Sequence, residues 1–268
     1  MPRLIFYDID GTLIDPATHR VPPDAAEAMR QARRNGCLNI INTGRTLCNM
    51  DARLDGLPVD GWVLGCGTRI RLGEETLTAF SYSPEESAEL RERILRSGLS
   101  AVYEGDEAIW LEESYDRNDP LIEGMRAYAM RMGIGRVVHT GDPAFAFVKI
   151  FIVEREEARV RRLLEALDGR LEGIRRRDTG SGWELVPAGF SKGTGIDVIR
   201  ERLGVPPEDC YVIGDSANDL SMLEHVPNSI AMGNAEEDVK RICAYVTAAA
   251  GDGGIAQALA HYGLSGVT

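Results

Sequence analysis

The sequence is short of lysine, of closely spaced cysteines and of uninterrupted apolar stretches. Only three of the 30 basic residues in the 268-residue chain are lysines. The five cysteines are scattered and include no C-x-x-C pair, which argues against a disulfide framework and against a zinc site. The longest stretch without a charged residue, Gly253–Thr268, is too short and too polar to span a membrane. The N-terminal segment turns acidic at Asp8, unlike a signal peptide. We therefore expect a soluble, cytoplasmic protein with free thiols.

The charge balance of the chain is acidic. Its 42 acidic residues outnumber the 30 basic ones, which gives a net charge of −12 at pH 7. Because such a chain repels phosphate backbones and anionic lipid head groups, we expect no nucleic-acid partner and no membrane partner. The hydrophobic share of 44% and the charged share of 27% are those of an ordinary globular protein, and the length suits one large domain or two unequal ones.

The first part of the chain alternates between strand-like and helix-like segments. Apolar runs at Leu4–Tyr7, Cys37–Ile41 and Trp62–Leu64 predict buried strands. A helix capped by Asp24 is expected after the first run, and a further helix after the second. This order is typical of a parallel sheet covered by helices on both faces.

The alternation is interrupted in the middle of the chain and returns near its end. The middle contains helix-like segments, short strand-like runs such as Ser100–Glu104, and a long apolar run at Phe145–Val153 that predicts a strand. We predict an α/β protein in which residues 1–82 and 187–268 form a doubly wound, Rossmann-like core with a parallel sheet. Residues 83–186 are expected to form an inserted α+β cap domain.

Two aspartates follow the first predicted strand, in the segment Asp8-Ile9-Asp10-Gly11-Thr12. Residues i and i+2 of an extended chain project to the same side, so both carboxylates can face one point, and Gly11 allows a sharp turn. Ligands of open parallel sheets bind beyond the carboxyl ends of the strands, where this segment falls. An ordinary strand-end turn is the alternative, since Asp and Gly favour turns.

A second acidic segment, Gly214–Asp219, follows another apolar run. If that strand lies beside the first one, Asp8, Asp10 and Asp215 converge on a site made only of oxygen atoms. Such a site selects Mg²⁺, which prefers octahedral oxygen ligands. Asp219 fits either this site or the first turn of a helix, where an acid interacts favourably with the helix dipole.

Two further segments at predicted helix starts can hold a phosphate group. Thr43-Gly44-Arg45 follows the second strand and offers a hydroxyl and free backbone N–H groups, although an ordinary helix cap has the same features. Lys192 lies in Ser191-Lys192-Gly193 and supplies a compact positive charge. Because lysine is so scarce in this chain, we favour a functional role for Lys192 over that of a surface residue.

Together the four segments resemble the haloacid dehalogenase superfamily. D-x-D-G-T, a threonine after the second strand, an isolated lysine and G-D-x-x-N-D occur in the order of that family. Gly214–Leu223 and the later Ala231-Met232-Gly233-Asn234-Ala235 are similar to its Cof-type, subclass IIB branch of sugar phosphatases. The insertion resembles the α/β cap of that branch in position and size, so the resemblance covers essentially the whole chain.

The resemblance implies a Mg²⁺-dependent phosphatase that hydrolyses small phosphate monoesters, such as sugar phosphates, through an aspartyl-phosphate. It implies Asp8 as the nucleophile and Asp10 as the general acid and base. The implied Mg²⁺ ligands are Asp8, Asp10 through its backbone carbonyl, Asp215 and Asp219. The implied phosphate-binding residues are Thr43, Gly44, Lys192 and Asn218, and the implied substrate contact is Arg45.

Other functions of the same fold stay open. A phosphomutase or phosphotransferase acting on sugar phosphates is the alternative enzyme, and a sugar-phosphate sensor without catalysis is the alternative of another class. Such a sensor would typically have lost one of the residues Asp8, Asp10, Lys192 or Asp215, all of which are present. The chain departs from the branch at Cys66-Gly67-Thr68, which stands where Asn-Gly-Ala is usual, and this puts a substrate contact at Cys66 in doubt.

No motif identifies the pocket for the rest of the substrate. The candidates in the cap, each of which also has an ordinary structural explanation, are Tyr115, Arg117, Tyr128, Lys149 and Trp183. The expected partner is a small-molecule phosphate ester, and the expected assembly is a monomer or a homodimer.

Overall fold

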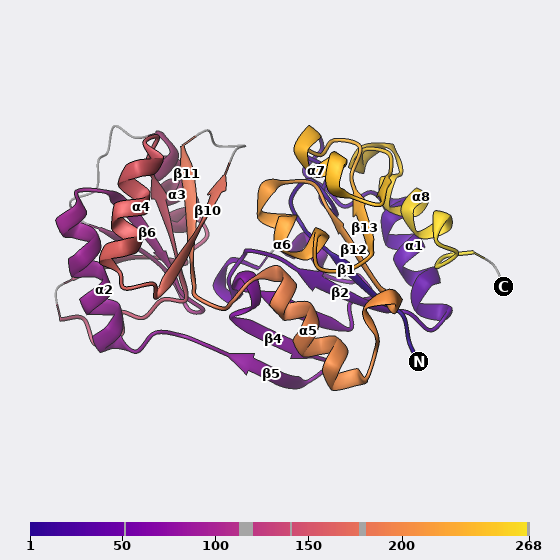
Figure 1. Cartoon of the computed structure of the whole chain (residues 1–268), viewed down its shortest axis with the longest axis horizontal. Helices are drawn as coiled ribbons and strands as arrows, with labels where there is room; N and C mark the ends of the chain where they lie inside the picture. The colour runs from indigo at the N-terminus through magenta and orange to yellow at the C-terminus, as the bar shows by residue number, and fades with distance from the viewer. Residues whose placement is uncertain (51, 113–119, 140, 177–180, 267–268) are drawn as a thin grey trace. The chain divides into compact units, whose positions relative to one another are not determined.

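The structure is a computed structural model, and it describes all residues except 51, 113–119, 140, 177–180 and 267–268. The chain divides into two compact units (Figure 1). Unit 1 comprises Met1–Gly44, Asp51–Ala79 and Ser191–Thr268, and unit 2 comprises Arg45–Met50 and Phe80–Phe190. That the units act as a catalytic core and a substrate cap stays a prediction.

Unit 1 is built on an eight-stranded sheet in the order β14-β13-β12-β1-β2-β3-β4-β5. The strands are β1 (Leu4–Tyr7), β2 (Leu38–Asn42), β3 (Gly61–Leu64), β4 (Arg69–Leu72), β5 (Glu75–Ala79), β12 (Cys210–Gly214), β13 (Asn228–Ala231) and β14 (Tyr245–Val246). The strands from β14 to β3 pair in parallel, and β4 and β5 extend the sheet in antiparallel fashion. The predicted parallel α/β core is therefore confirmed.

Helices cover both faces of this sheet. The helices of unit 1 are α1 (Pro23–Arg34), α5 (Lys192–Leu203), α6 (Leu220–Leu223), α7 (Glu237–Ile242) and α8 (Gly254–His261). In Figure 1, α1 and α8 lie side by side, as do α5 and α6. The Asn39 amide donates to the Met29 carbonyl of α1, whereas the Asn42 amide donates to the Lys192 carbonyl of α5. Since residues three apart on a strand point to opposite faces, α1 and α5 cover opposite faces.

Unit 2 contains a six-stranded sheet in the order β10-β11-β9-β6-β7-β8. The strands are β6 (Ser100–Glu104), β7 (Ile109–Glu112), β8 (Gly135–Val138), β9 (Lys149–Val153), β10 (Leu171–Arg176) and β11 (Gly182–Pro187). The helices are α2 (Pro84–Ser97), α3 (Pro120–Arg131) and α4 (Glu157–Ala166). All strand pairs are antiparallel except that of β7 with β8.

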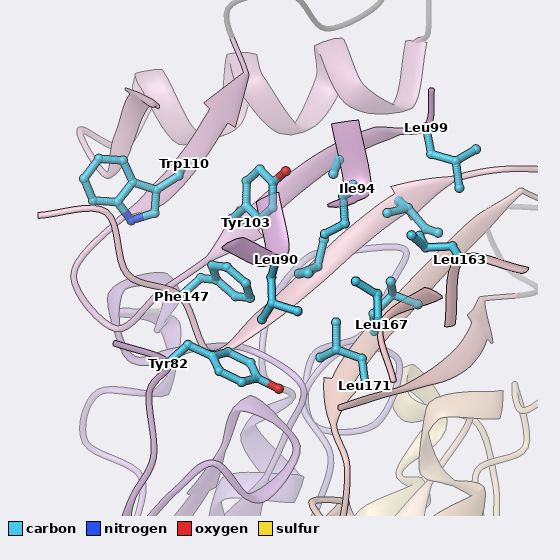
Figure 2. Packing of buried hydrophobic residues seen from close by; sticks show 14 of the residues in the cluster. Tyr82, Leu90, Ile94, Leu99, Tyr103, Trp110, Phe147, Leu163, Leu167 and Leu171 are labelled. Carbon is cyan, nitrogen blue, oxygen red and sulfur yellow. The ribbon is translucent and has the colours of Figure 1, made fainter. Parts of the chain in front are cut away.

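Two apolar clusters lie on the two faces of the second sheet. The larger contains Leu90 and Ile94 of α2, Leu163 of α4 and the rings of Tyr103 and Phe147 (Figure 2). The smaller contains side chains of α3 together with strand residues such as Val102 and Phe151. The alternation along β6, with Tyr103 in one cluster and Val102 in the other, follows from the two-residue period of a strand.

Several local predictions were wrong. Asp24 is not the cap of α1, because the helix begins at Pro23, and proline is favoured at the first helical position. The described part of the segment between β2 and β3 contains short 3₁₀ turns in place of the expected helix. The apolar run that starts at Phe145 becomes a strand only from Lys149, because Phe145 ends a turn with Asp142.

The sequence also failed to predict β4, β5 and β8, whose residues mix charged and apolar types.

A search of the described residues found no helix long and apolar enough to cross a membrane.

Candidate active site

The acidic segments of the sequence meet at the carboxyl ends of two neighbouring strands. Tyr7 of β1 lies opposite Ile213 of β12, and the Asp8 amide donates to the Ile213 carbonyl at 3.0 Å. Asp8 and Asp215 therefore leave the sheet at the same edge. Both strands are apolar and fully buried, which fixes the position of the residues that follow them.

The loop after β1 packs tightly against Asp215. Gly11 has φ +85°, and a Cβ there would lie 2.2 Å from Asp215 Oδ2, so both the conformation and the close approach require glycine. The Thr12 hydroxyl donates to Asp215 Oδ1 at 2.9 Å. The Asn234 amide donates to the Gly11 carbonyl at 2.8 Å. The carboxylate of Asp215 is thus held in place by the segment that carries Asp8.

Lys192 connects the two acidic segments. Its amine lies 2.5 Å from Asp8 Oδ1 and 2.6 Å from Asp219 Oδ1, and its side chain is completely buried. Lys192 is the first residue of α5, whose start is capped by the Ser191 hydroxyl. The Asn42 amide at the end of β2 donates to the Lys192 carbonyl at 2.9 Å, which adds a second anchor for this residue.

Asp219 has two roles in this arrangement. Its Oδ2 accepts the backbone N–H groups of Asp215 at 2.9 Å and Ser216 at 3.1 Å, while its Oδ1 faces Lys192. It therefore shapes the turn after β12 and also contributes charge to the site. Whether Asp219 also binds a metal ion stays a prediction.

The electrostatics of the site favour a bound cation. Burial, followed by repulsion from Asp219, raises the pKa of Asp8 to about 7. Burial and repulsion from Asp219 and Asp8 raise the pKa of Asp215 to about 8. Burial opposes the charge of Lys192, but Asp219 and Asp8 more than offset it and raise its pKa. One lysine thus faces three carboxylates.

The three carboxylates have the geometry of a metal site. One ligand atom from each of Asp8, Asp215 and Asp219 lies within 4.8 Å of the others. An all-oxygen donor set with excess negative charge fits a hard divalent cation such as Mg²⁺. The Asp10 carboxylate is not part of this group.

The predicted phosphate-binding residues lie in unit 1. The Thr43 amide donates to the Val63 carbonyl at 2.9 Å, and the side chain is buried. Asn218 is buried, and its Oδ1 accepts the Ser216 hydroxyl at 2.7 Å. Gly44 ends the first segment of unit 1. Arg45, by contrast, groups with unit 2, where its guanidinium donates to the Asn49 carbonyl at 3.4 Å.

The cap candidates have different surroundings. Tyr115 and Arg117 lie outside the described residues. Trp183 packs in the larger apolar cluster and donates its indole N–H to the Glu154 carbonyl, which is a structural role. The Tyr128 hydroxyl donates to Asn49 Oδ1 at 2.7 Å. Lys149 is buried between two glutamates.

Three residues that hold the site together received no role from the sequence: Thr12, Asn42 and Asn234. Two of them lie within or beside recognised motifs, and Asn42 directly precedes Thr43-Gly44-Arg45. Their positions in or beside the motifs could have indicated that they lie at the site. Their partners could not be predicted, because these are 150 or more residues away in the sequence. Cys66 adopts φ +58°, and its backbone N–H donates to the Thr43 carbonyl, so the turn persists without the usual asparagine.

Comparison with known proteins identifies the family. The family model for haloacid dehalogenase-like hydrolases matches residues 5–259. This chain belongs to the haloacid dehalogenase-like hydrolases. The HAD subclass IIB sugar phosphatase BT4131 superposes with a TM-score of 0.82 at 26% identity, over 98% of this chain and 99% of the other.

Curated relatives of this haloacid dehalogenase-like hydrolase include phosphatases. The chain is 30% identical to a phosphoglycolate phosphatase of Methanopyrus kandleri, over 96% of this chain and 95% of the relative. It is 24% identical to the 5-amino-6-(5-phospho-D-ribitylamino)uracil phosphatase YwtE of Bacillus subtilis, over 95% and 96% of the two chains. The prediction of a phosphoric monoester hydrolase of the Cof-type branch is confirmed.

Proposed function

We propose that the protein is a Mg²⁺-dependent phosphatase that hydrolyses small phosphate monoesters, sugar phosphates in particular, through a phosphate ester of Asp8. The observation that carries this proposal is the buried cluster in which Lys192 bridges Asp8 and Asp219 beside Asp215. A buried carboxylate that is oriented by a lysine and surrounded by other acids is typical of a reactive site, and a cation bound by those acids would offset their repulsion of a phosphate group.

The proposed reaction has two displacements. In the first, the Asp8 oxygen that does not face Lys192 attacks phosphorus, the bond to the ester oxygen breaks, and Asp10 gives a proton to the departing alcohol. In the second, water attacks phosphorus, Asp10 takes its proton, and the bond to Asp8 breaks to release phosphate. Thr43, Gly44, Lys192 and Asn218 are proposed to bind the phosphoryl oxygens, whose charge Lys192 offsets.

Mg²⁺ would be held by the side chains of Asp8, Asp215 and Asp219, with Asp10 contributing its carbonyl. Bound there, it would neutralise the charge of the phosphoryl group. The residues fit this ion because their pKa values are raised by burial and mutual repulsion, and a divalent cation removes that repulsion.

The substrate class is proposed on the likeness to BT4131, which is described as a sugar phosphatase. Relatives that act on phosphoglycolate and on a ribityl phosphate show that this family includes both carboxylate-bearing and hydroxyl-rich esters. Unit 2 is proposed as the substrate cap. Arg45 is proposed as a substrate contact because it directly follows Gly44.

The proposal is tested by phosphate release from a panel of phosphate esters, with Mg²⁺ and with a chelator, in the wild type and in Asp8→Asn. We expect release only with Mg²⁺ and none from the variant, whose fold should be unchanged by circular dichroism. Brief reaction with ³²P-labelled acetyl phosphate and an acid quench should label the peptide that contains Asp8. Substantial turnover by Asp8→Asn, or a label elsewhere, would refute the nucleophile assignment.

The same panel separates the alternatives. A phosphomutase would transfer the label from one sugar phosphate to a second sugar, and a sensor would bind an ester without releasing phosphate. No contact among the described residues favours either alternative over hydrolysis.

A further inference from the structure

Unit 2 contains a pocket of about 550 Å³ that is lined by side chains of α2 and α4 and has no part in the proposed chemistry of unit 1. All of its described lining residues belong to unit 2. The two helices lie side by side (Figure 1), and both contribute to the larger apolar cluster. The volume falls within the range of roughly 300–1,000 Å³ that is typical of small-molecule sites, so the pocket has room for a small ligand.

The pocket is lined by positive charge in a protein that is acidic as a whole. Arg93 and Arg96 of α2 and Arg159 and Arg162 of α4 all line it, and none of the described lining residues is acidic. The whole chain, by contrast, has a net charge of −12. Guanidinium groups gathered around one pocket repel one another, and an anion bound among them removes that repulsion.

Two of the four arginines are held by the end of the opposite helix. Arg93 of α2 donates to the carbonyl of Ala166, the last residue of α4, at 2.9 Å. Arg159 of α4 donates to the carbonyl of Ser97, the last residue of α2, at 3.4 Å. Carbonyl groups at a helix C-terminus carry partial negative charge that would repel an anion, and these two guanidinium groups offset it. The pocket is therefore built from two antiparallel helices that each fix an arginine of the other.

The same two arginines are also paired with acids. Arg93 lies 2.7 Å from Glu89 and 2.5 Å from Asp168, and Arg159 lies 2.5 Å from Glu154. None of these three acids is among the described residues that line the pocket. The pairs orient the two guanidinium groups and partly compensate their charge, so the main contacts with a ligand must come from the other two arginines.

Arg96 and Arg162 are the arginines that remain available to a ligand. Arg96 is paired only with Glu92, one helical turn away at 3.1 Å, and 74% of its side chain is exposed. Exposed ion pairs of this kind contribute little, so a ligand can replace Glu92 at small cost. The Arg162 guanidinium has neither an ion-pair partner nor a hydrogen bond among the described residues. The two side chains come from different helices, so an anion between them would connect α2 to α4.

We infer that this pocket binds a small polyanion with adjacent phosphate groups, held by Arg96 and Arg162. A phosphate group carries up to about two negative charges and several acceptor oxygens, and it matches the planar fork of a guanidinium group. Adjacent phosphates therefore place more charge in a pocket of this size than carboxylates do. A long polyanion such as RNA would extend beyond the pocket and meet the negative charge of the rest of the chain.

The first test measures hydrogen exchange by mass spectrometry in the full chain, at low ionic strength and without divalent cations, with tripolyphosphate or orthophosphate. We expect tripolyphosphate to slow exchange at the amides of α2 and α4, and orthophosphate to do so much less at the same concentration. An anion bound beside Lys192 would instead protect β1 and α5, so the location of the protection separates the two sites. Unchanged exchange in α2 and α4, or equal protection by the two anions, overturns the inference.

Three variants assign the protection to the pocket. Arg162→Gln and Arg96→Gln should each raise the Kd for tripolyphosphate, titrated through that protection, roughly tenfold, because each loses hydrogen bonds between charged groups. Arg155→Gln is the matched control: Arg155 is exposed just before α4, does not line the pocket and has no ion-pair partner in the described chain. It removes one positive charge from the same region and should change the Kd by less than about twofold.

Because Arg162 is exposed, its replacement should leave the fold intact, which circular dichroism checks. A Kd in Arg162→Gln equal to that of the wild type, or an equal loss in Arg155→Gln, would show that the pocket is not the binding site.

Two further probes test the class of ligand. Citrate carries several negative charges on carboxylates, and we expect it to protect α2 and α4 less than tripolyphosphate does. Equal protection by citrate would overturn the assignment to phosphate groups. A single-stranded oligonucleotide that bound more tightly than tripolyphosphate would overturn the assignment to a small ligand. No step of these experiments uses turnover, so an error in the proposed function would not alter their outcome.

Discussion

Two of the three lysines in the chain are buried between carboxylates, one in each unit. Lys192 lies 2.5 Å from Asp8 and 2.6 Å from Asp219, and Lys149 lies 3.1 Å from Glu184 and 3.3 Å from Glu104. The local pattern is the same, but the electrostatic outcome differs. Burial and repulsion raise the pKa of Asp8 to about 7, whereas Lys149 and Arg176 overcome the effect of burial and lower the pKa of Glu184 to about 2.

The origin of the difference is the backbone that carries the charges. The carboxylates of unit 1 stand at strand ends and on a 3₁₀ turn, where a third acid, Asp215, joins them. Those of unit 2 stand on β6 and β11, the two strands that flank β9, and the cations come from adjacent strands, Lys149 from β9 and Arg176 from β10. A buried lysine between two acids therefore does not by itself identify a reactive site. The excess of negative charge over the available cations is what distinguishes the site of unit 1.

Replacing Lys149 tests the structural side of this comparison and should have the largest effect on stability. Lys149→Met leaves Glu104 buried without its ion-pair partner, and loss of one member of a buried pair costs about 3–5 kcal/mol. We expect faster hydrogen exchange at the amides of β6, β9 and β11, measured by mass spectrometry, with no change in β1 and β12. Equal exchange in Lys149→Met and the wild type would show that the ion pairs of Lys149 do not stabilise these strands.

Replacing Lys192 tests the functional side. Lys192→Met removes the positive charge beside Asp8, and loss of one such stabilising group typically costs roughly 10²- to 10³-fold in kcat. Lys240→Met is the control, because Lys240 is partly exposed and pairs only locally with Glu237 among the described residues. The measurement is Mg²⁺-dependent release of phosphate from the best ester of the panel. Equal activities of the two variants would remove Lys192 from the reaction.

The contrast between the lysines also shows how far the sequence could be interpreted. The scarcity of lysine singled out Lys192, and the structure places its amine beside Asp8 and Asp219, although its part in the reaction stays a prediction. Lys149 stands in an apolar run, and its partners Glu104 and Glu184 depend on strand pairing across 45 and 35 residues. Register of that kind is set by tertiary packing, which no local pattern in the sequence encodes.

The same limit applies to other parts of the molecule. The strands of the parallel core were predictable because they are continuous apolar runs, as in β1, with all four residues buried. The strand β4 and the edge strands β5 and β8 carry charged or polar residues such as Arg69 and Arg136, so they lack the continuous apolar runs by which the core strands were predicted. Asn42 could not be assigned to Lys192 because 150 residues separate them.

The acids of the two units should respond to pH in opposite ways, because the pKa values of Asp8 and Asp215 are raised, whereas that of Glu184 is lowered. In the metal-free protein, Asp8 and Asp215 bind protons up to about pH 7 and 8, whereas both release them near pH 3.8 when unfolded. Their contribution to stability therefore falls as pH rises from about 4 to 8, by up to about 1.4 kcal/mol per pH unit for each proton. Glu184 has its pKa lowered from 4.5 to about 2, so its contribution is present above pH 4.5 and is lost as pH falls toward 2.

This prediction is checked by thermal unfolding at several pH values without divalent cations. Asp215→Asn should flatten the dependence between pH 4 and 8, and Glu184→Gln should flatten it between pH 2 and 4.5. Added Mg²⁺ should raise the unfolding temperature more at pH 8 than at pH 5, because binding requires the ionised carboxylates. A stabilisation by Mg²⁺ that does not vary with pH would contradict the raised pKa values of the unit 1 acids.

The smallest effect is expected from the hydrogen bond between Thr12 and Asp215 in the unit 1 site. The Thr12 hydroxyl donates to Asp215 Oδ1 at 2.9 Å, whereas the carboxylates Glu104 and Glu184 of unit 2 are held by cations. Thr12→Val removes this donor, which orients the carboxylate and lowers its pKa. Loss of such a partner weakens metal binding by about tenfold at the lower end of the usual range. Mg²⁺ titration of phosphate release should show this weakening in Thr12→Val and recovery in Thr12→Ser. If Thr12→Val binds Mg²⁺ as the wild type does, orientation of Asp215 by Thr12 is not what prepares the site for the metal, and the close approach of Gly11, with the hydrogen bond from Asn234 to its carbonyl, must hold the loop against that carboxylate.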